Sequence, residues 1–320
     1  MANDIPDHYW KNLLAITTRA QADDPTPENE RQIPKTLDDE SRKWLEEVMR
    51  GLVNETDPVR QLQYVLNSLH QYASSMENIS EEDTDKVLEL ADRLDDLLSI
   101  SDLSKQFINN GGLLILETFI MQSKYDELRS SFAQIILTWA ENNEEAQNAI
   151  IDCTLFMEMY NLLDMHESLS PVILSSVLSA ISGCIRSNAL AFEKFQSANG
   201  PQKLLQLVKT TKHSQIAAKG ARIMTSISYT MQDKPEHAKQ MTMPIIDAYS
   251  HLVSLGRNFV ELEYIREFIL NYVEWTDVDE STRSSLLSTF DLETRRRDLD
   301  ATNMELLRKL QHKFAPLCTG

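Results

Sequence analysis

Glycine is scarce in this sequence, with 8 in 320 residues, and cysteine is scarcer, with 3. Loops that cradle phosphates need several closely spaced glycines, and neither a Walker loop nor a GxGxxG motif is present. The cysteines Cys153, Cys184 and Cys318 show no CxxC spacing, and two of them lie in apolar helical patterns. This pattern predicts buried free thiols rather than disulfides or metal ligands.

Long apolar runs are also missing. No run approaches the roughly 20 residues needed to cross a bilayer. Residues 1–8 carry acids where a signal peptide would carry bases. We therefore expect no membrane association and a cytoplasmic location, with the nucleus as an alternative.

Basic residues are outnumbered, 31 against 49 acidic ones, which gives a formal net charge of −18. Such a surface repels nucleic acid and anionic membranes, so neither is expected as a partner. The charge is uneven: residues 77–102 hold ten acids and two bases, residues 126–167 nine acids and one base, and residues 186–222 seven bases and one acid. These blocks are either ordinary solvated helix faces or a bipolar surface that steers a bipolar partner.

Catalytic constellations are absent as well. The seven histidines are scattered, without an HExxH motif or a partner at ligand spacing: His8, His70, His166, His213, His237, His251 and His312. Carboxylates occur on charged helical faces rather than inside apolar strings, so no general acid with a raised pKa is indicated. We expect that the protein is not an enzyme and that it binds neither a metal ion nor a cofactor.

What the sequence does contain is helical periodicity, without sustained alternation of period two. Ser80 and Asp83 form a plausible capping box before an apolar helical stripe that runs to Leu98. Ser170 followed by Pro171 is typical of a helix start, and Gly256 is typical of a helix end. The fold class is therefore predicted as all-α.

The apolar pattern repeats along the chain with a period of an armadillo or HEAT unit. One set of positions recurs after 43 and then 45 residues: Phe107, Leu116, Phe119 and Ile120; Ile150, Met159, Leu162 and Leu163; Phe195, Leu204, Leu207 and Val208. A later helix of each unit repeats too: Phe132, Ile136 and Trp139; Val177, Ile181 and Cys184; Gly220, Met224 and Ile227. Three units between about residues 102 and 231 predict an armadillo-like, right-handed helical solenoid.

We predict three segments. Residues 1–36 are expected to form a flexible N-terminal arm, residues 37–255 the armadillo-like repeat domain, and residues 256–320 extra C-terminal capping helices. A flanking unit is expected at 59–98, and later helices at 244–255, 258–275 and 293–314. The arm carries one apolar motif, which either docks on the body or binds a partner: Tyr9, Trp10, Leu13, Leu14 and Ile16.

The repeat period also predicts which residues line a concave groove, the natural binding surface of such a stack. Helix positions between the buried ones form three columns: Gln134, Ser179 and Arg222; Thr138, Gly183 and Ser226; Glu141, Arg186 and Tyr229. Arg186 and Arg222 are the first candidates, because a guanidinium group suits interface carboxylates. The alternative is that both are merely exposed or pair with nearby acids of the same chain.

Several short polar motifs in these repeats resemble those of the Fes-type family of nucleotide-exchange factors, whose animal members are called heat-shock protein 70-binding proteins. They lie in residues 102–114, 131–143, 146–147, 179–188, 191–192 and 198–200. The motifs most specific for this family are Asn142-Asn143-x-x-Ala146-Gln147 and Ala180-Ile-Ser-x-Cys184-x-Arg186-x-Asn188. The resemblance covers roughly residues 38–255; nothing after Leu255, including Arg295–Arg297, matches.

The resemblance implies an armadillo-like domain that embraces one lobe of the ATPase domain of a heat-shock protein 70 chaperone and speeds ADP release. It also implies that the N-terminal arm, whose motif is similar to the family's, competes for the chaperone's substrate-binding domain and aids substrate release. Secretory relatives have a signal sequence, so the resemblance points to the cytosolic branch.

Two other functions remain open. An armadillo adaptor would bind another protein or an extended peptide, but such grooves repeat Trp and Asn, whereas Trp139 is matched by Cys184 and Ile227. A regulatory subunit of an enzyme complex is the second alternative.

Overall fold

The computed structural model describes residues 43, 57–257, 259–296 and 299–315. The N-terminal arm and its apolar motif lie outside these residues. The chain divides into two units, 1–54 and 55–320, and the second contains all the helices described below. The described residues contain helices and no strand, so the all-α prediction is confirmed.

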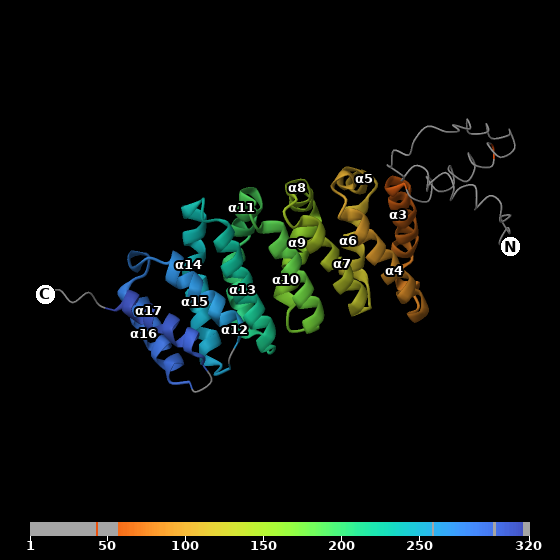
Figure 1. Cartoon of the computed structure of the whole chain (residues 1–320). Coiled ribbons are helices and arrows are strands. Elements are labelled where there is room, and N and C mark those ends of the chain that lie inside the picture. Colours follow the sequence, from red (N-terminus) through yellow and green to blue (C-terminus); the bar gives the residue numbers. More distant parts are fainter. Residues whose placement is uncertain (1–42, 44–56, 258, 297–298, 316–320) are drawn as a thin grey trace, which may run out of the picture. The chain divides into compact units, whose positions relative to one another are not determined.

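The helices of this unit stand side by side in chain order (Figure 1). Their bounds are α3 Pro58–Ser74, α4 Glu81–Leu98, α5 Ser104–Asn109, α6 Gly112–Gln122, α7 Asp126–Ala140, α8 Glu144–Asp152, α9 Thr154–Leu162, α10 Pro171–Ile185, α11 Ala189–Ser197, α12 Gly200–Thr210, α13 Ser214–Thr230, α14 Pro235–Ser254, α15 Glu261–Tyr272, α16 Glu280–Thr294 and α17 Ala301–Phe314.

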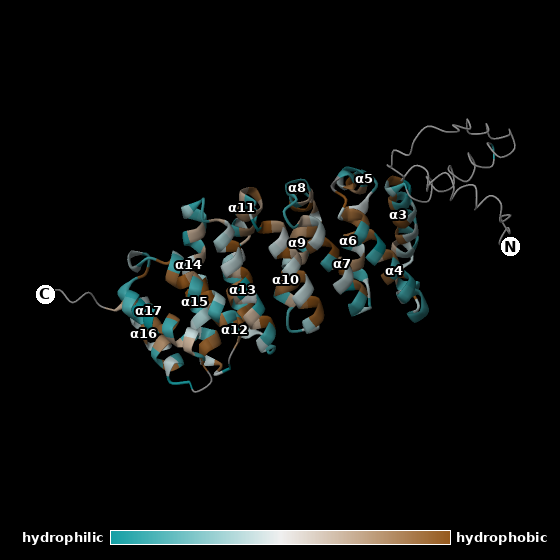
Figure 2. Cartoon of the chain, viewed as in Figure 1, coloured by the Kyte–Doolittle hydropathy of each residue, from teal (hydrophilic) through white to brown (hydrophobic). Residues whose placement is uncertain are grey.

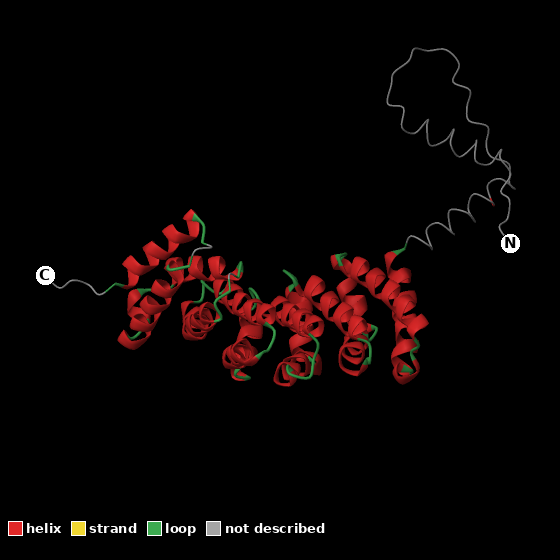
Figure 3. Ribbon diagram, turned by 90° about the horizontal axis from the view of Figure 1, so that it is seen from below, coloured by secondary structure: helices red, strands yellow, loops and turns green. Residues whose placement is uncertain are grey.

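The helices form rows that run along the stack. Helices α4, α7, α10, α13 and α15 pack one against the next, and we call them the third-helix row. Helices α3, α6 and α9 form another row, as do α12, α14 and α16, while the short helices α5, α8 and α11 open the three repeats. Figure 3 shows the rows partly end-on. The armadillo-like arrangement of three units with flanking helices is confirmed.

The core runs through the stack as one apolar cluster. All the recurring positions with large side chains are less than a tenth exposed, as the period predicted. Figure 2 shows hydrophobic and hydrophilic residues on each labelled helix, as expected where one face is buried and the other solvated. Cys184 is buried in α10, but Cys153 lies between α8 and α9 and is only half-buried.

A ring and a glycine set the packing of the first helix on the second in two of the repeats. A Cβ atom added to Gly112 would lie 2.2 Å from Phe107, and one added to Gly200 would lie 2.2 Å from Phe195. The corresponding residues of the middle repeat are Ile150 and Leu155. Where the ring is replaced by a smaller side chain, the space is filled from the second helix instead, which keeps the packing dense.

The predicted helix signals are confirmed at three ends. Ser80 and Asp83 form the capping box of α4, Ser170 caps α10 ahead of Pro171, and Gly256 adopts φ +68° just after α14. The left-handed conformation at Gly256 is one that glycine adopts at little cost.

The later helices differ from the prediction. Helix α14 begins at Pro235, and Pro244 lies inside it rather than at its start. The expected helix 293–314 is two helices, because Asp300 accepts a hydrogen bond from the backbone of Asn303 and starts α17 anew. Helix α16 was missed since its sequence is rich in Ser and Thr and only Leu286 and Phe290 supply buried apolar side chains.

The ring and glycine pairing gives a stability prediction. Gly200→Ala should reduce the free energy of unfolding by about 1–3 kcal/mol, because the new methyl group overlaps the ring of Phe195. In a Phe195→Ile background the same change should cost much less, since the middle repeat already tolerates Leu155 beside Ile150. Urea unfolding of the four proteins in this double-mutant cycle measures the coupling. Equal costs in both backgrounds would contradict the packing argument.

Candidate functional site: a basic groove on the third-helix row

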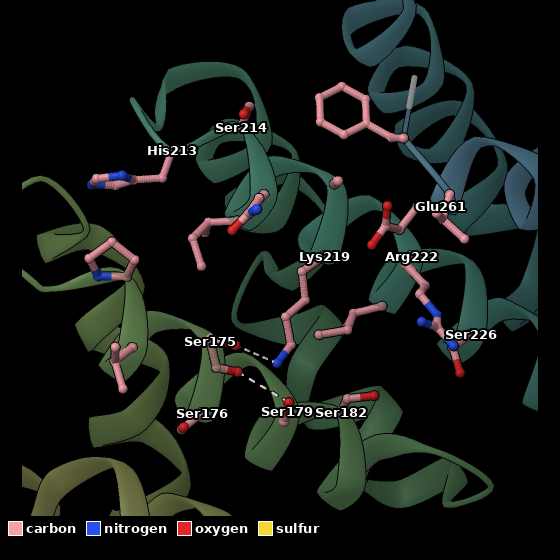
Figure 4. Close-up of a pocket in the computed structure, with 18 of the residues that line it drawn as sticks. Ser175, Ser176, Ser179, Ser182, His213, Ser214, Lys219, Arg222, Ser226 and Glu261 are labelled. Atoms are coloured by element: carbon pink, nitrogen blue, oxygen red, sulfur yellow. Dashed lines mark hydrogen bonds between the residues drawn. The ribbon is translucent and has the colours of Figure 1, made fainter. Parts of the chain in front are cut away.

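A groove of about 1240 Å³ lies between α10, α13 and the start of α15 (Figure 4). Its polar lining consists mainly of cations and hydroxyl groups. The cations are Arg186, Lys212, Lys219, Arg222 and Arg257, and the serines are Ser175, Ser176, Ser179, Ser182, Ser214 and Ser226. Among its apolar residues, Val172 and Val260 are 56% and 85% exposed. The groove is therefore open, positively charged and partly apolar.

Four of the nine residues expected from the repeat columns line this groove: Ser179, Arg186, Arg222 and Ser226. Gln134, Thr138 and Glu141 are exposed on α7 or at its end, outside the groove lining. Tyr229 is 51% exposed at the opposite end of α13.

Gly183 is buried, because its α-carbon faces Leu137 of α7 so closely that an added Cβ would lie 3.0 Å from the Leu137 side chain. Glycine here lets two helices of the third-helix row approach each other. Gly183 therefore offers no exposed side chain to a partner, unlike its neighbours in the columns.

Several of the column residues contact a residue of a neighbouring repeat. The Arg186 guanidinium and the Glu141 carboxylate lie 2.9 Å apart. The Arg222 guanidinium lies 5.8 Å from the ring centroid of Tyr264, and the rings of Tyr229 and Tyr272 meet edge to face at 5.5 Å. Arg186 thus has the intramolecular acidic partner that the sequence left open, whereas Arg222 rests on an aromatic face.

Lys219 is a groove residue that the sequence analysis missed. Its amine donates a hydrogen bond to the Ser175 hydroxyl at 2.7 Å, and Ser176 in turn contacts Ser130 of α7. Ser176 and Lys219 each lie three residues before a member of the column of Gln134, Ser179 and Arg222, and thus belong to a fourth column one turn nearer the helix starts. The same period, applied one turn earlier, would have found it.

The electrostatics of Lys219 are unfavourable to its charge. Burial lowers the pKa of this amine, and the neighbouring Arg222 lowers it further. Desolvation and a like charge both disfavour the protonated form. An anion placed in the groove would offset both effects.

The third-helix row changes sign along its length. At its α4 end, burial raises the pKa of Asp95, whose carboxyl group also interacts with the Thr138 hydroxyl. Asp92 and Asp96 lie beside it. On α13, farther along the row, the charged residues of the groove are Lys219 and Arg222, so the row is acidic at α4 and basic at α13, while α15 at its end adds Glu261, Glu263 and Glu267 beside Arg222.

In the described part of the chain, no group of three His, Cys, Asp or Glu side chains could hold a metal ion. No described helix is both long and apolar enough to span a bilayer.

The polar motifs that carry the family resemblance lie where one repeat ends and the next begins. Asn143 caps α8 and Asn188 caps α11. The buried Gln147 donates hydrogen bonds to the carbonyls of Gly183 and Arg186, and accepts one from Asn188. These residues shape the corners between repeats rather than the groove lining.

The chain is similar to known proteins in sequence and in fold. No protein-family model matches the chain. It is 24% identical, over 143 residues, to a protein of Yarrowia lipolytica (strain CLIB 122 / E 150) described as "Hsp70 nucleotide exchange factor FES1". The match covers 43% of this chain and 51% of that protein, so the chain spans about half the length of the curated relative it matches.

Solved structures of designed armadillo repeat proteins have the same fold. One, YIII(Dq)4CqI, is 14% identical with a TM-score of 0.51, and the match covers 77% of this chain and 99% of that one. Another, YIII(Dq.V1)4CPAF in complex with peptide (KR)4, is 16% identical with a TM-score of 0.53 over 81% and 98% of the two chains. These comparisons show an armadillo-repeat fold and confirm the resemblance to the Fes-type family.

Proposed function

We propose that this protein is a co-chaperone that binds the ATPase domain of a heat-shock protein 70 chaperone and promotes ADP release. The observation that carries the proposal is the likeness to the Hsp70 nucleotide exchange factor of Yarrowia lipolytica. The proposed site of action is the cytosol, with the nucleus as an alternative, and the proposed role is binding without catalysis.

The proposed mechanism requires only differential affinity. An exchange factor must bind the open, nucleotide-free chaperone more tightly than the closed form, and nucleotide then weakens its binding by the same factor. Couplings between two sites are typically about 1–3 kcal/mol. A few contacts that are possible in only one arrangement of the chaperone's lobes supply a free energy of this size.

The third-helix row supports this role through its charge and its unused donors. Arg186 keeps one guanidinium nitrogen on Glu141, while its Nε atom is shielded from water without a hydrogen-bond acceptor. The Arg186 side chain as a whole is 29% exposed, so its outer nitrogen atoms offer charged donors to a partner's carboxylate. Arg222 is exposed and carries its charge toward the groove.

A second candidate function is that of an armadillo adaptor for extended peptides. The groove on the third-helix row favours it, and one structural neighbour was solved in complex with the peptide (KR)4. The groove of the present chain is basic, so a peptide of that charge would be repelled.

The first test is stopped-flow release of a fluorescent ADP analogue from a cytosolic heat-shock protein 70 chaperone. The protein should accelerate release, and the acceleration should saturate with its concentration. Arg186→Glu and Arg222→Glu should each weaken chaperone binding roughly tenfold or more while the helical content stays unchanged.

Matched variants separate binding from structure in this assay. Glu141→Gln removes the internal partner of Arg186 but keeps its positive charge, so the acceleration should persist. Lys234→Glu makes the same charge reversal between α13 and α14, outside the groove lining, and should also leave it intact. A folded protein that gives no acceleration would move the function to the adaptor class.

The N-terminal arm gives a separate prediction. Trp10→Ala combined with Leu13→Ala should slow the release of a fluorescent substrate peptide from the chaperone but leave ADP release unchanged. The reason is that the apolar motif is proposed to act on the substrate-binding domain and the repeat domain on the ATPase domain. Peptide release measured by fluorescence anisotropy checks this, with Thr17→Ala plus Thr18→Ala as the control. Equal rates for the two double variants would remove the arm from the mechanism.

A further inference from the structure

We infer that the groove between α10, α13 and α15 binds an acidic peptide segment of a protein partner, with its carboxylates on Lys219 and Arg222. The inference follows from the charge, shape and lining of the groove. It does not rest on the exchange function proposed above.

Within the described residues, four of the five cations of the groove form no ion pair, and only Arg186 does, with Glu141. In the described part of the chain, Lys212, Lys219 and Arg222 form no ion pair, and Arg257 donates instead to the Ser214 hydroxyl. The other helices behave differently: three lysines on α11 and α12 each pair with an acid, in Lys194–Asp152, Lys203–Asp164 and Lys209–Asp247. In a chain of net charge −18, four described cations thus surround this groove without a carboxylate within ion-pair distance.

Lys219 lies where an incoming carboxylate would be most favourable. It reaches across from α13 to Ser175 of α10, and the two residues lie within the groove lining (Figure 4). The hydroxyl is a neutral acceptor, which leaves the charge of the amine uncompensated. A carboxylate bound here forms a charge-assisted hydrogen bond, which is roughly twice as strong as a neutral one.

The helix starts add to the positive potential. Helices α10 and α13 begin at the groove, and neither has an acid in its first turn. By contrast, α4 begins with Glu81, Glu82 and Asp83, and α7 with Asp126 and Glu127. The partial positive charge at a helix N-terminus attracts anions when no acidic side chain of the same helix compensates it. Glu261 at the start of α15 is the single acid in the lining of this groove.

Shape and surroundings select a peptide among anions. A volume of about 1240 Å³ exceeds the range typical of small-molecule pockets. The exposed side chains of Val172 and Val260 offer apolar contacts that a free phosphate cannot use, and the serines offer hydrogen bonds to a peptide backbone. A long polyanion such as nucleic acid would extend over the acidic α4 end of the row and be repelled there.

The test uses the full chain and a fluorescein-labelled peptide of alternating glutamate and valine. Fluorescence anisotropy at low ionic strength should show saturable binding that weakens as salt is added. Peptides of alternating lysine and valine, or glutamine and valine, should not bind. Lys219→Met and Arg222→Gln should each weaken binding of the glutamate peptide about tenfold, the loss expected for one hydrogen bond to a charged group.

The matched control is Lys203→Met, which removes a lysine already paired with Asp164 on the neighbouring helix α12. It should leave peptide affinity unchanged. Equal affinity of all three variants, or no binding by the folded wild-type protein, would overturn the inference.

Other occupants give different results. Displacement of the peptide by inorganic phosphate at comparable concentration would show a general anion site and overturn the inference. A concentration-dependent dimer that Lys219→Met abolishes would do the same, because it would assign the groove to the acidic helices of a second copy. Failure of peptide binding alongside intact acceleration of ADP release would reject this inference alone and leave the proposed function standing.

Discussion

The turn from the third helix of one repeat into the first helix of the next is the constraint on which this architecture depends. A solenoid has contacts only between neighbouring units, so an error at one junction displaces everything after it. Here the chain turns through one residue in the left-handed conformation, Asn142 or Ser187, followed by an asparagine cap. The buried amide of Gln147 then joins the end of α10 to the next cap, through the carbonyls of Gly183 and Arg186 and through Asn188.

This junction also decides what reaches the binding face. Because Gln147 holds the backbone carbonyl of Arg186, the Arg186 side chain leaves the end of α10 at a fixed point and meets Glu141 one repeat earlier. The groove cations Lys219 and Arg222 project from the next helix of the third-helix row, in the first half of α13. The polar motifs that carry the family resemblance therefore act mainly on the spacing of the groove walls. Arg186 is the one groove cation that belongs to them, and the other four lie outside them: Lys212, Lys219, Arg222 and Arg257.

The sequence predicted well what depends on periodicity and less well what depends on neighbours. Buried positions such as Phe107 and Phe195 repeat with the chain, so the core and the three units could be read directly. Pro244 was misplaced because a proline is ordinarily found in the first turn of a helix, and only packing in the stack retains it inside α14. Gly183 lies between buried positions yet is itself buried, since the distance between α7 and α10 is not encoded in either helix alone. Whether an arginine is paired or available likewise depends on a residue about 45 positions away.

The C-terminal helices, which the resemblance does not cover, bear on the site through α15. This helix supplies Glu261 to the groove, and the two residues just before it supply Phe259 and Val260. Its Arg266 is 1% exposed and forms an ion pair with the fully buried Glu293 of α16, whose carboxylate also accepts a hydrogen bond from Tyr249 of α14. Burying two charges costs desolvation free energy that apolar residues would not, so such a cluster contributes more to a defined arrangement than to stability. It ties α15 to α14 and α16 through buried side chains, and thereby holds the third wall of the groove in place against α13.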